Sequence, residues 1–174
     1  MNDNIKEILK TVLTYVFIVL VVIAIRLFFI DPVRVEGRSM NTTLQNGEIM
    51  LLNKIIYKRH DIKRFDIVVI NEHNKLIIKR VIGLPGETIE YKDNKLYING
   101  QEMKDPYPST ATEDFSIEDI GHVKVPGDTY FVMGDNRSDS LDSRYGSVGV
   151  INKTQILGRA RFVIWPINRF GMVK

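Results

Sequence analysis

Ser39 and Lys79 have the chemistry of a nucleophile and its base. In an extended strand, Ile77 and Val81 would lie on the same face as Lys79. An ammonium group held among apolar side chains loses hydration, so its pKa falls below the ordinary value of ~10.4. The neutral amine can then accept the proton of a serine hydroxyl. The two residues could therefore form a Ser-Lys dyad.

Local sequence also leaves simpler interpretations open for both residues. A Ser-Met pair commonly fills a surface or a core, and a lysine at a strand end commonly keeps its ammonium in water. A histidine base is a further alternative, although His60, His73 and His122 lie in polar, turn-like stretches. Their spacing fits no metal site, and cysteine is absent, so the sequence predicts neither a metal nor a thiol nucleophile.

A third polar stretch, Gly134 to Gly146, follows an apolar segment and consists mainly of Asp, Asn, Arg and Ser. It could be a solvated loop. It could also form a buried hydrogen-bond network in which Asp142 pairs with Arg144. A calcium loop is a third option, but the Gly and Glu that an EF-hand needs at set positions are missing.

The elements that must position these residues begin with an apolar run. Residues 11–30 span twenty positions, enough to cross a hydrocarbon core of ~30 Å as a helix, with Arg26 near one end where it can reach the interface. We expect a polar tail at 1–10 and a single-pass anchor at 11–30. A core helix or a cleaved signal peptide is the alternative. The charges flanking the run do not decide its orientation.

From Asp31-Pro32 onward the pattern has period two, which predicts a mainly β, antiparallel body over 31–174. Two hairpins are expected, one joining 66–70 to 76–82 and one joining 89–91 to 96–98, with further strands at 130–133 and 160–166. Residues 102–121 are irregular and contain Pro106 and Pro108, so we expect an exposed excursion there.

Composition narrows the functional classes. Hydrophobic residues make up 44% and charged residues 26% of 174 positions, as in a folded globular protein. The net charge is +3 and the basic residues are scattered, so no nucleic-acid partner is predicted.

Three stretches together, around Ser39, around Lys79 and from Gly134 to Gly146, resemble type I (leader) signal peptidases, in the form found in Gram-positive bacteria. Ser39-Met40 with Leu44 is similar to the nucleophile box of that family. Lys79 to Gly86 resembles its lysine box, and Gly134 to Arg144 resembles its C-terminal signature box. Their order behind an apolar span strengthens the resemblance, which covers nearly the whole chain.

The resemblance implies a role for each matching residue. Ser39 would be the nucleophile and Lys79 the general base, with Ser140 orienting the lysine amine. Asp142 and Arg144 would form a structural ion pair beneath the site. Shallow pockets for the small −1 and −3 side chains of a signal peptide would be lined by Val33, Val35, Met40, Leu44, Ile77 and Ile78. The substrate would lie extended beside the edges at Val33–Val35 and Leu76–Ile78.

Two positions depart from the pattern of the family. Thr42 replaces a proline, which removes a fixed φ and predicts a looser loop after the nucleophile. Gly37, which we place in the substrate site, stands where Gram-negative members have a serine that helps to stabilise the oxyanion. One missing oxyanion donor can cost ~10²–10³ in rate, so the Ser39 N–H would carry more of the work.

The sequence therefore predicts a membrane-bound serine endopeptidase that removes signal peptides without a cofactor. Its expected partners are preproteins emerging from the export machinery and the lipid bilayer, with the catalytic body extracytoplasmic. One alternative is a catalytically silent, membrane-tethered β-domain that binds exported proteins. Another is a self-cleaving Ser-Lys protein of the stress-repressor kind, which would need a DNA-binding head where the apolar run stands.

Overall fold

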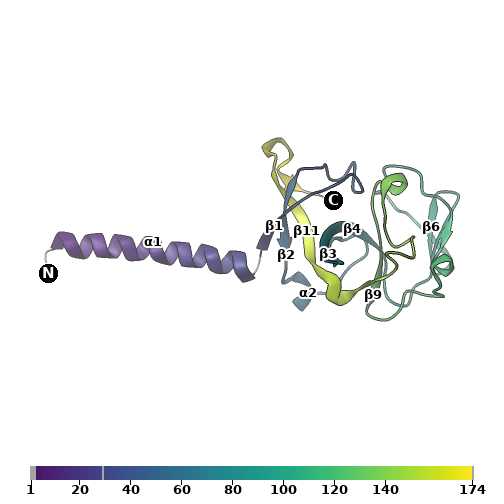
Figure 1. Ribbon diagram of the computed structural model, residues 1–174, viewed down its shortest axis with the longest axis horizontal. Coiled ribbons are helices and arrows are strands. Elements are labelled where there is room, and N and C mark those ends of the chain that lie inside the picture. Colours follow the sequence, from purple (N-terminus) through teal and green to yellow (C-terminus); the bar gives the residue numbers. More distant parts are fainter. Residues whose placement is uncertain (1–2, 29, 174) are drawn as a thin grey trace.

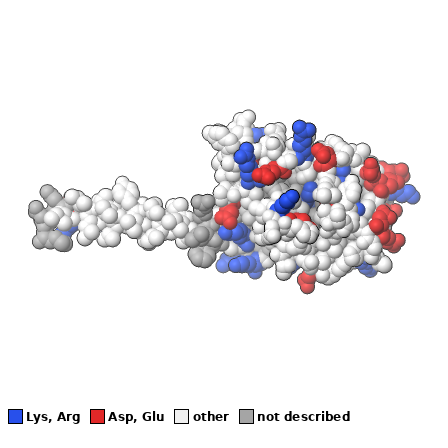
Figure 2. Space-filling view, viewed as in Figure 1, with Lys and Arg blue, Asp and Glu red and all other residues white. Residues whose placement is uncertain are grey.

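A single long helix leads into a β-rich body (Figure 1). The computed structural model describes residues 3–28 and 30–173. Helix α1 (Asp3–Phe28) contains an apolar window, Ile5–Ala24, of 20 residues with mean hydropathy 2.2, and none of that window is buried. On the face seen in Figure 2, the middle of α1 shows no charged side chain, whereas the body shows many. An exposed apolar surface of this length is what a membrane anchor requires.

The boundaries around this helix differ from the predicted tail at 1–10 and span at 11–30. Residues Asp3 to Lys10 are already helical, and strand β1 (Ile30–Arg34) has begun at Ile30. Pro32 lies inside β1, which is tolerated because β1 is an edge strand with one side unpaired by the sheet. The side chain of Arg26 lies outside the described residues.

The main sheet has the strand order β1-β2-β11-β3-β4-β9-β10, with β12 paired to β11. Each neighbouring pair is antiparallel, which confirms the predicted class. The strands are β2 (Ile49–Asn53), β3 (Ile67–Glu72), β4 (Lys75–Gly83), β9 (Thr129–Met133), β10 (Ile151–Asn152), β11 (Ile156–Trp165) and β12 (Gly171–Met172).

A smaller sheet has the order β7-β6-β5-β8 and lies at the end of the body away from α1 (Figure 1). Its strands are β5 (Ile89–Lys92), β6 (Lys95–Ile98), β7 (Gln101–Met103) and β8 (Phe115–Ser116). Short helices complete the fold: α2 (Ile56–Arg59), η1 (Ile117–Ile120), η2 (Arg137–Asp139), η3 (Lys153–Gln155) and η4 (Ile167–Arg169).

Both predicted hairpins are confirmed, β3–β4 and β5–β6. Their two-residue turns, His73-Asn74 and Asp93-Asn94, have positive φ at both positions. That geometry matches the right-handed twist of the flanking strands, and Asn and Asp tolerate it better than most residues. Local turn chemistry therefore sets the register of β4, and with it the direction in which Lys79 points.

Residues 102–121 are more ordered than the predicted excursion. The segment contributes β8 and η1, and the side chains of Thr112 and Ile117 are buried. The Ser109 N–H donates to the Asp135 carbonyl oxygen at 2.8 Å. Prolines and small polar residues obscured these contacts because the partners are distant in sequence. The segment packs against the polar loop that follows β9.

Candidate active site

Ser39 and Lys79 line one cavity of about 460 Å³. Ser39 lies in the turn after β1, whereas Lys79 comes from the middle of β4. Ile77, two residues before Lys79 on the same strand face, also lines the cavity. His73, one of the histidines considered as an alternative base, also lines it. The remaining lining side chains, which sequence reasoning missed, are Glu72, Lys75, Leu141, Ser147 and Val148.

Lys79 is buried, with only 4% of its surface exposed. Its Nζ donates a hydrogen bond to Ser140 Oγ at 2.9 Å. Burial lowers the pKa of Lys79 from 10.5 to about 8, and the nearby Asp142 carboxylate partly opposes this shift. No carboxylate forms an ion pair with Lys79 within the described part of the chain. The amine can therefore be neutral near physiological pH, as a general base must be.

A pH–rate profile tests this property of Lys79. The base works only when neutral, so kcat/KM should rise about tenfold per pH unit below pH 8 and level off above it. The profile should be measured on a peptide that itself does not titrate between pH 6 and 10. A midpoint near 10.5, the ordinary lysine value, would contradict the desolvation of Lys79.

The turn carrying Ser39 is held against the loop that follows β9. Asn136 N–H donates to the Ser39 carbonyl oxygen at 2.9 Å, and Asn136 Nδ2 donates to the Arg38 carbonyl oxygen at 3.2 Å. At Gly134, a Cβ atom would collide with the Ser39 carbonyl and with the Ser140 side chain. Gly134 therefore lets the nucleophile turn and the lysine partner approach the same backbone.

The same turn leaves an N–H group available. In residues 3–28 and 30–173, the Ser39 N–H donates no hydrogen bond to another protein group. Gly37 has φ +88, a left-handed conformation that glycine adopts without strain, and its N–H donates to Asn46 Oδ1 at 3.0 Å. The backbone thus explains why glycine suits this position, where a serine would be strained.

The loop after Thr42 is anchored on both sides. Leu44 N–H donates to the Met40 carbonyl oxygen at 2.8 Å, and both side chains are buried. Thr43 Oγ1 donates to Asp135 Oδ2. These contacts hold the turn in place, and the looser loop expected from Thr42 stays a prediction.

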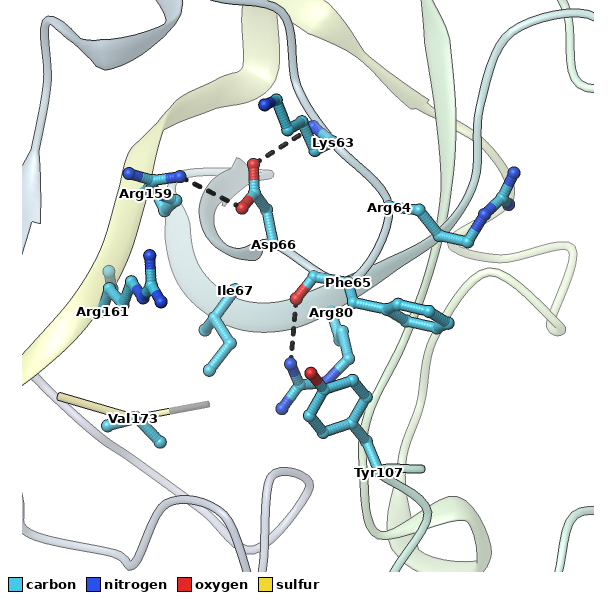
Figure 3. A pocket seen from close by; sticks show the side chains of 11 residues that line it. Lys63, Arg64, Phe65, Asp66, Ile67, Arg80, Tyr107, Arg159, Arg161 and Val173 are labelled. Carbon is cyan, nitrogen blue, oxygen red and sulfur yellow. Dashed lines mark hydrogen bonds and ion pairs between the residues drawn. The ribbon is translucent and has the colours of Figure 1, made fainter. Parts of the chain in front are cut away.

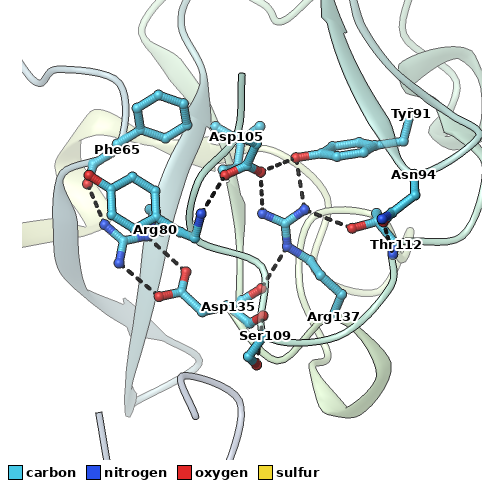
Figure 4. A network of polar contacts seen from close by, with 12 residues as sticks. Phe65, Arg80, Tyr91, Asn94, Asp105, Ser109, Thr112, Asp135 and Arg137 are labelled. Atoms are coloured by element: carbon cyan, nitrogen blue, oxygen red, sulfur yellow. Dashed lines mark hydrogen bonds and ion pairs between the residues drawn. The ribbon is translucent and has the colours of Figure 1, made fainter. Parts of the chain in front are cut away.

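Three Arg–Asp pairs support the loop that bears Ser140. Arg80 donates from Nε and Nη2 to the two carboxylate oxygens of Asp135, at 2.8 and 2.7 Å. Arg137 pairs with Asp105 from the 102–121 segment (Figure 4). Arg144 pairs with Asp142 at 2.9 Å, and that carboxylate also accepts from the Gly134 N–H at 3.0 Å. Asp142 and Arg144 thus form the ion pair that the sequence predicted.

Sequence reasoning assigned no role to the other two pairs. Arg80 and Asp135 are essentially unexposed. In a buried network of this kind, every hydrogen-bond donor must find an acceptor within the protein. Their positions inside the lysine box and the signature box were the available signal. What the sequence did not contain was the distance between them in space.

Asp135→Ala should lower the free energy of unfolding by about 3–5 kcal/mol, because it leaves the Arg80 guanidinium buried without its partner. Denaturant unfolding of the full chain in detergent measures the loss. Lys95→Ala is the matched control, because the Lys95–Glu102 pair is exposed and should hardly move the midpoint. Equal effects of the two substitutions would contradict a structural role for the Arg80–Asp135 pair.

The predicted pocket residues divide into two groups. Ile77 lines the cavity with Ser39 and Lys79. The other five form part of a hydrophobic cluster on the sheet and are no more than 8% exposed: Val33, Val35, Met40, Leu44 and Ile78. Adjacent strand residues point to opposite faces, which separates Ile78 from Ile77. These five side chains form a packed apolar floor, and their contact with a substrate stays a prediction.

His73 lies at the edge of the same cavity and is the one histidine among its lining residues. Its Nδ1 is 2.8 Å from Glu72 Oε1, and its side chain is 85% exposed. No group of three or more His, Cys, Asp and Glu side chains that could hold a metal occurs in the described residues.

Comparisons with known proteins show which family this chain is similar to. The family model described as signal peptidase, peptidase S26, matches residues 8–165. The chain is 44% identical over 167 residues to signal peptidase I T of Bacillus subtilis, covering 91% of this chain and 86% of that protein. It is 43% identical over 162 residues to signal peptidase I of Bacillus amyloliquefaciens, covering 90% and 87% of the two chains. A crystal structure of a signal peptidase I from Enterococcus faecalis aligns with TM-score 0.52 at 37% identity, over 57% of this chain and 97% of that one.

Proposed function

The chain belongs to the signal peptidase family, peptidase S26, and we propose that Ser39 and Lys79 are its catalytic dyad. It is a serine endopeptidase that cleaves signal peptides from preproteins. The observation that carries the dyad is the buried Lys79 amine, with a pKa lowered to about 8, in the same cavity as Ser39. Ser140 positions this amine through its hydroxyl oxygen.

The reaction proceeds through an acyl-enzyme. Neutral Lys79 takes the proton of the Ser39 hydroxyl, and Ser39 Oγ attacks the carbonyl carbon of the −1 residue. The Ser39 N–H stabilises the oxyanion, and the intermediate collapses as Lys79 returns the proton to the amine of the departing mature protein. Lys79 then activates a water molecule that hydrolyses the ester and releases the signal peptide.

An extended substrate can pair with free strand edges near the dyad. In the described sheet, β9 pairs with β4 only from Arg80 onward, which leaves residues 75–79 unpaired on that side. Strand β1 lies at the end of the strand order. A peptide strand added there would bring its −1 carbonyl to Ser39. The apolar floor defined above would lie beneath this peptide and would leave room only for small side chains at −1 and −3. It consists of Val33, Val35, Met40, Leu44 and Ile78.

Helix α1 anchors the enzyme to a membrane. We propose that it crosses the cell membrane once and leaves the body, from residue 31 onward, on the extracytoplasmic side. There the substrate would arrive from the export machinery with its own apolar segment still in the bilayer. The short distance in sequence between α1 and Ser39 would place the nucleophile near that membrane surface.

Cleavage of a preprotein by the full chain in detergent tests this function. N-terminal sequencing of the released protein should place the cut after a small −1 residue. The same preprotein with Ala→Leu at −1 is the control and should resist cleavage, because the floor leaves no room for it. A folded enzyme that cleaves neither would favour the silent, substrate-binding alternative.

A further inference from the structure

A second cavity, of about 520 Å³, is lined by Arg80 and residues around it (Figure 3). It lies on the face of β4 opposite the dyad. Lys79 and Arg80 are adjacent in β4, so Lys79 points into the active-site cavity and Arg80 into this one. We name it the rear cavity. Its lining side chains come from segments far apart in sequence: Lys63, Arg64, Phe65, Asp66, Ile67, Arg80, Tyr107, Arg159, Ala160, Arg161 and Val173.

Cationic groups outnumber carboxylates around the rear cavity. Five arginine and lysine side chains line it, and Asp66 is the only lining carboxylate among the described residues. Asp66 pairs with Arg159 at 3.3 Å. Two carboxylates outside the lining, Glu87 and Asp135, pair with Arg64 and Arg80. Counting all three carboxylates still leaves a net charge of about +2.

The excess charge comes from Lys63 and Arg161. Both are exposed, and neither pairs with a carboxylate in the described part of the chain. Arg80 belongs to the wall: its Nη1 donates to the Phe65 carbonyl oxygen at 2.9 Å, and the Tyr107 ring stacks 3.6 Å from its guanidinium carbon. Two cations at the rim are therefore available to an anion.

The cavity also has apolar walls. Ile67 and Ala160 are buried side chains of β3 and β11, and Val173 packs against the hydrophobic cluster that contains them. Apolar walls with a cationic rim suit a ligand that has both an oxyanion and a hydrophobic part.

The position of Arg159 brings this cavity close to the anchor. Antiparallel pairing aligns Ile30 of β1, Asn53 of β2 and Arg159 of β11 in one row across the sheet. Neighbouring strands are ~4.8 Å apart, so Arg159 lies about 10 Å across the sheet from Ile30. Ile30 is two residues beyond the end of α1, where the chain leaves the bilayer.

We propose that the rear cavity binds the phosphate group of an anionic phospholipid at the membrane surface, with Lys63 and Arg161 as its principal ligands. Lysine and arginine near a bilayer attract anionic headgroups, and the apolar walls accept the adjoining part of the lipid. This inference rests on the membrane anchoring proposed above and not on the dyad.

The test titrates dihexanoyl-phosphatidylglycerol into the full chain in nonionic detergent, by calorimetry. Dihexanoyl-phosphatidylcholine and inorganic phosphate are titrated in parallel. We expect phosphatidylglycerol to bind, and the double variant Lys63→Gln/Arg161→Gln to weaken binding about 10- to 30-fold. The matched control is Lys92→Gln/Lys124→Gln, which removes the same charge from exposed positions outside the cavity.

Retained affinity in the control variant, with the loss confined to the cavity variant, supports the site. Equal losses in both variants would mean attraction to net charge alone and would overturn it. Binding of inorganic phosphate but not of phosphatidylglycerol would overturn the assignment to lipid, as would equal binding of phosphatidylcholine. Cleavage of a short soluble peptide should be unchanged in both variants, which separates this result from a failure of the dyad.

Discussion

Replacing Ser39 with Ala should lower kcat for preprotein cleavage by at least ~10⁴-fold, because the acyl-enzyme can no longer form. The substitution keeps the backbone that holds the turn: the Ser39 carbonyl oxygen still accepts from Asn136 N–H. Unfolding of the variant should therefore match that of the wild type. Single-turnover cleavage of a preprotein in detergent measures the loss, with residual activity compared against buffer.

The control for this substitution is Ser116→Ala, which removes a hydroxyl from the second sheet, where it accepts from Glu118 N–H. Cleavage should remain near the wild-type rate. If Ser39→Ala cleaved at the wild-type rate as well, another residue would be the nucleophile and the dyad would be wrong.

Replacing Lys79 with Met should cause a comparable loss in kcat, because no neutral amine remains to accept the Ser39 proton. Methionine keeps an unbranched apolar chain in the same space, so the packing around β4 is preserved. Burial penalises the charged form of Lys79, and removing that cost should leave stability unchanged or higher. Kinetics and denaturant unfolding of one sample separate the two effects.

His73→Ala tests whether a histidine, and not Lys79, accepts the proton of Ser39. His73 lines the same cavity but carries its imidazole in solvent. If a histidine took the proton, His73→Ala would lose more activity than Lys79→Met. The expected order is the reverse.

Much of the β body could be predicted because its signals are local. The Asn and Asp residues at the hairpin tips adopt the positive φ that two-residue turns need. The alternation in β4 then sends Lys79 and Ile77 to one face and Arg80 to the other. Period and turn chemistry reside within a few neighbouring residues, so a sequence reveals them directly.

Contacts between distant segments could not be predicted in this way. Asp105 lies in a stretch that reads as an irregular loop, yet it pairs with Arg137 thirty-two positions later. Five of the apolar residues assigned to substrate pockets pack into the hydrophobic cluster of the sheet, and their contact with a substrate stays a prediction. The hydrophobicity of such side chains predicts that they are removed from water. Only the packing of the folded chain decides whether they contact the core or a substrate.

The sequence by itself determined the chemical parts of this enzyme: an apolar helix, a serine shortly after it, a lysine on an apolar strand face and a polar signature loop. Only the tertiary structure brought Ser39, Lys79 and Ser140 to one place, because their approach depends on β4, on the turn after β1 and on the loop after β9. Burial by the surrounding fold lowers the pKa of Lys79, and no local pattern can set that.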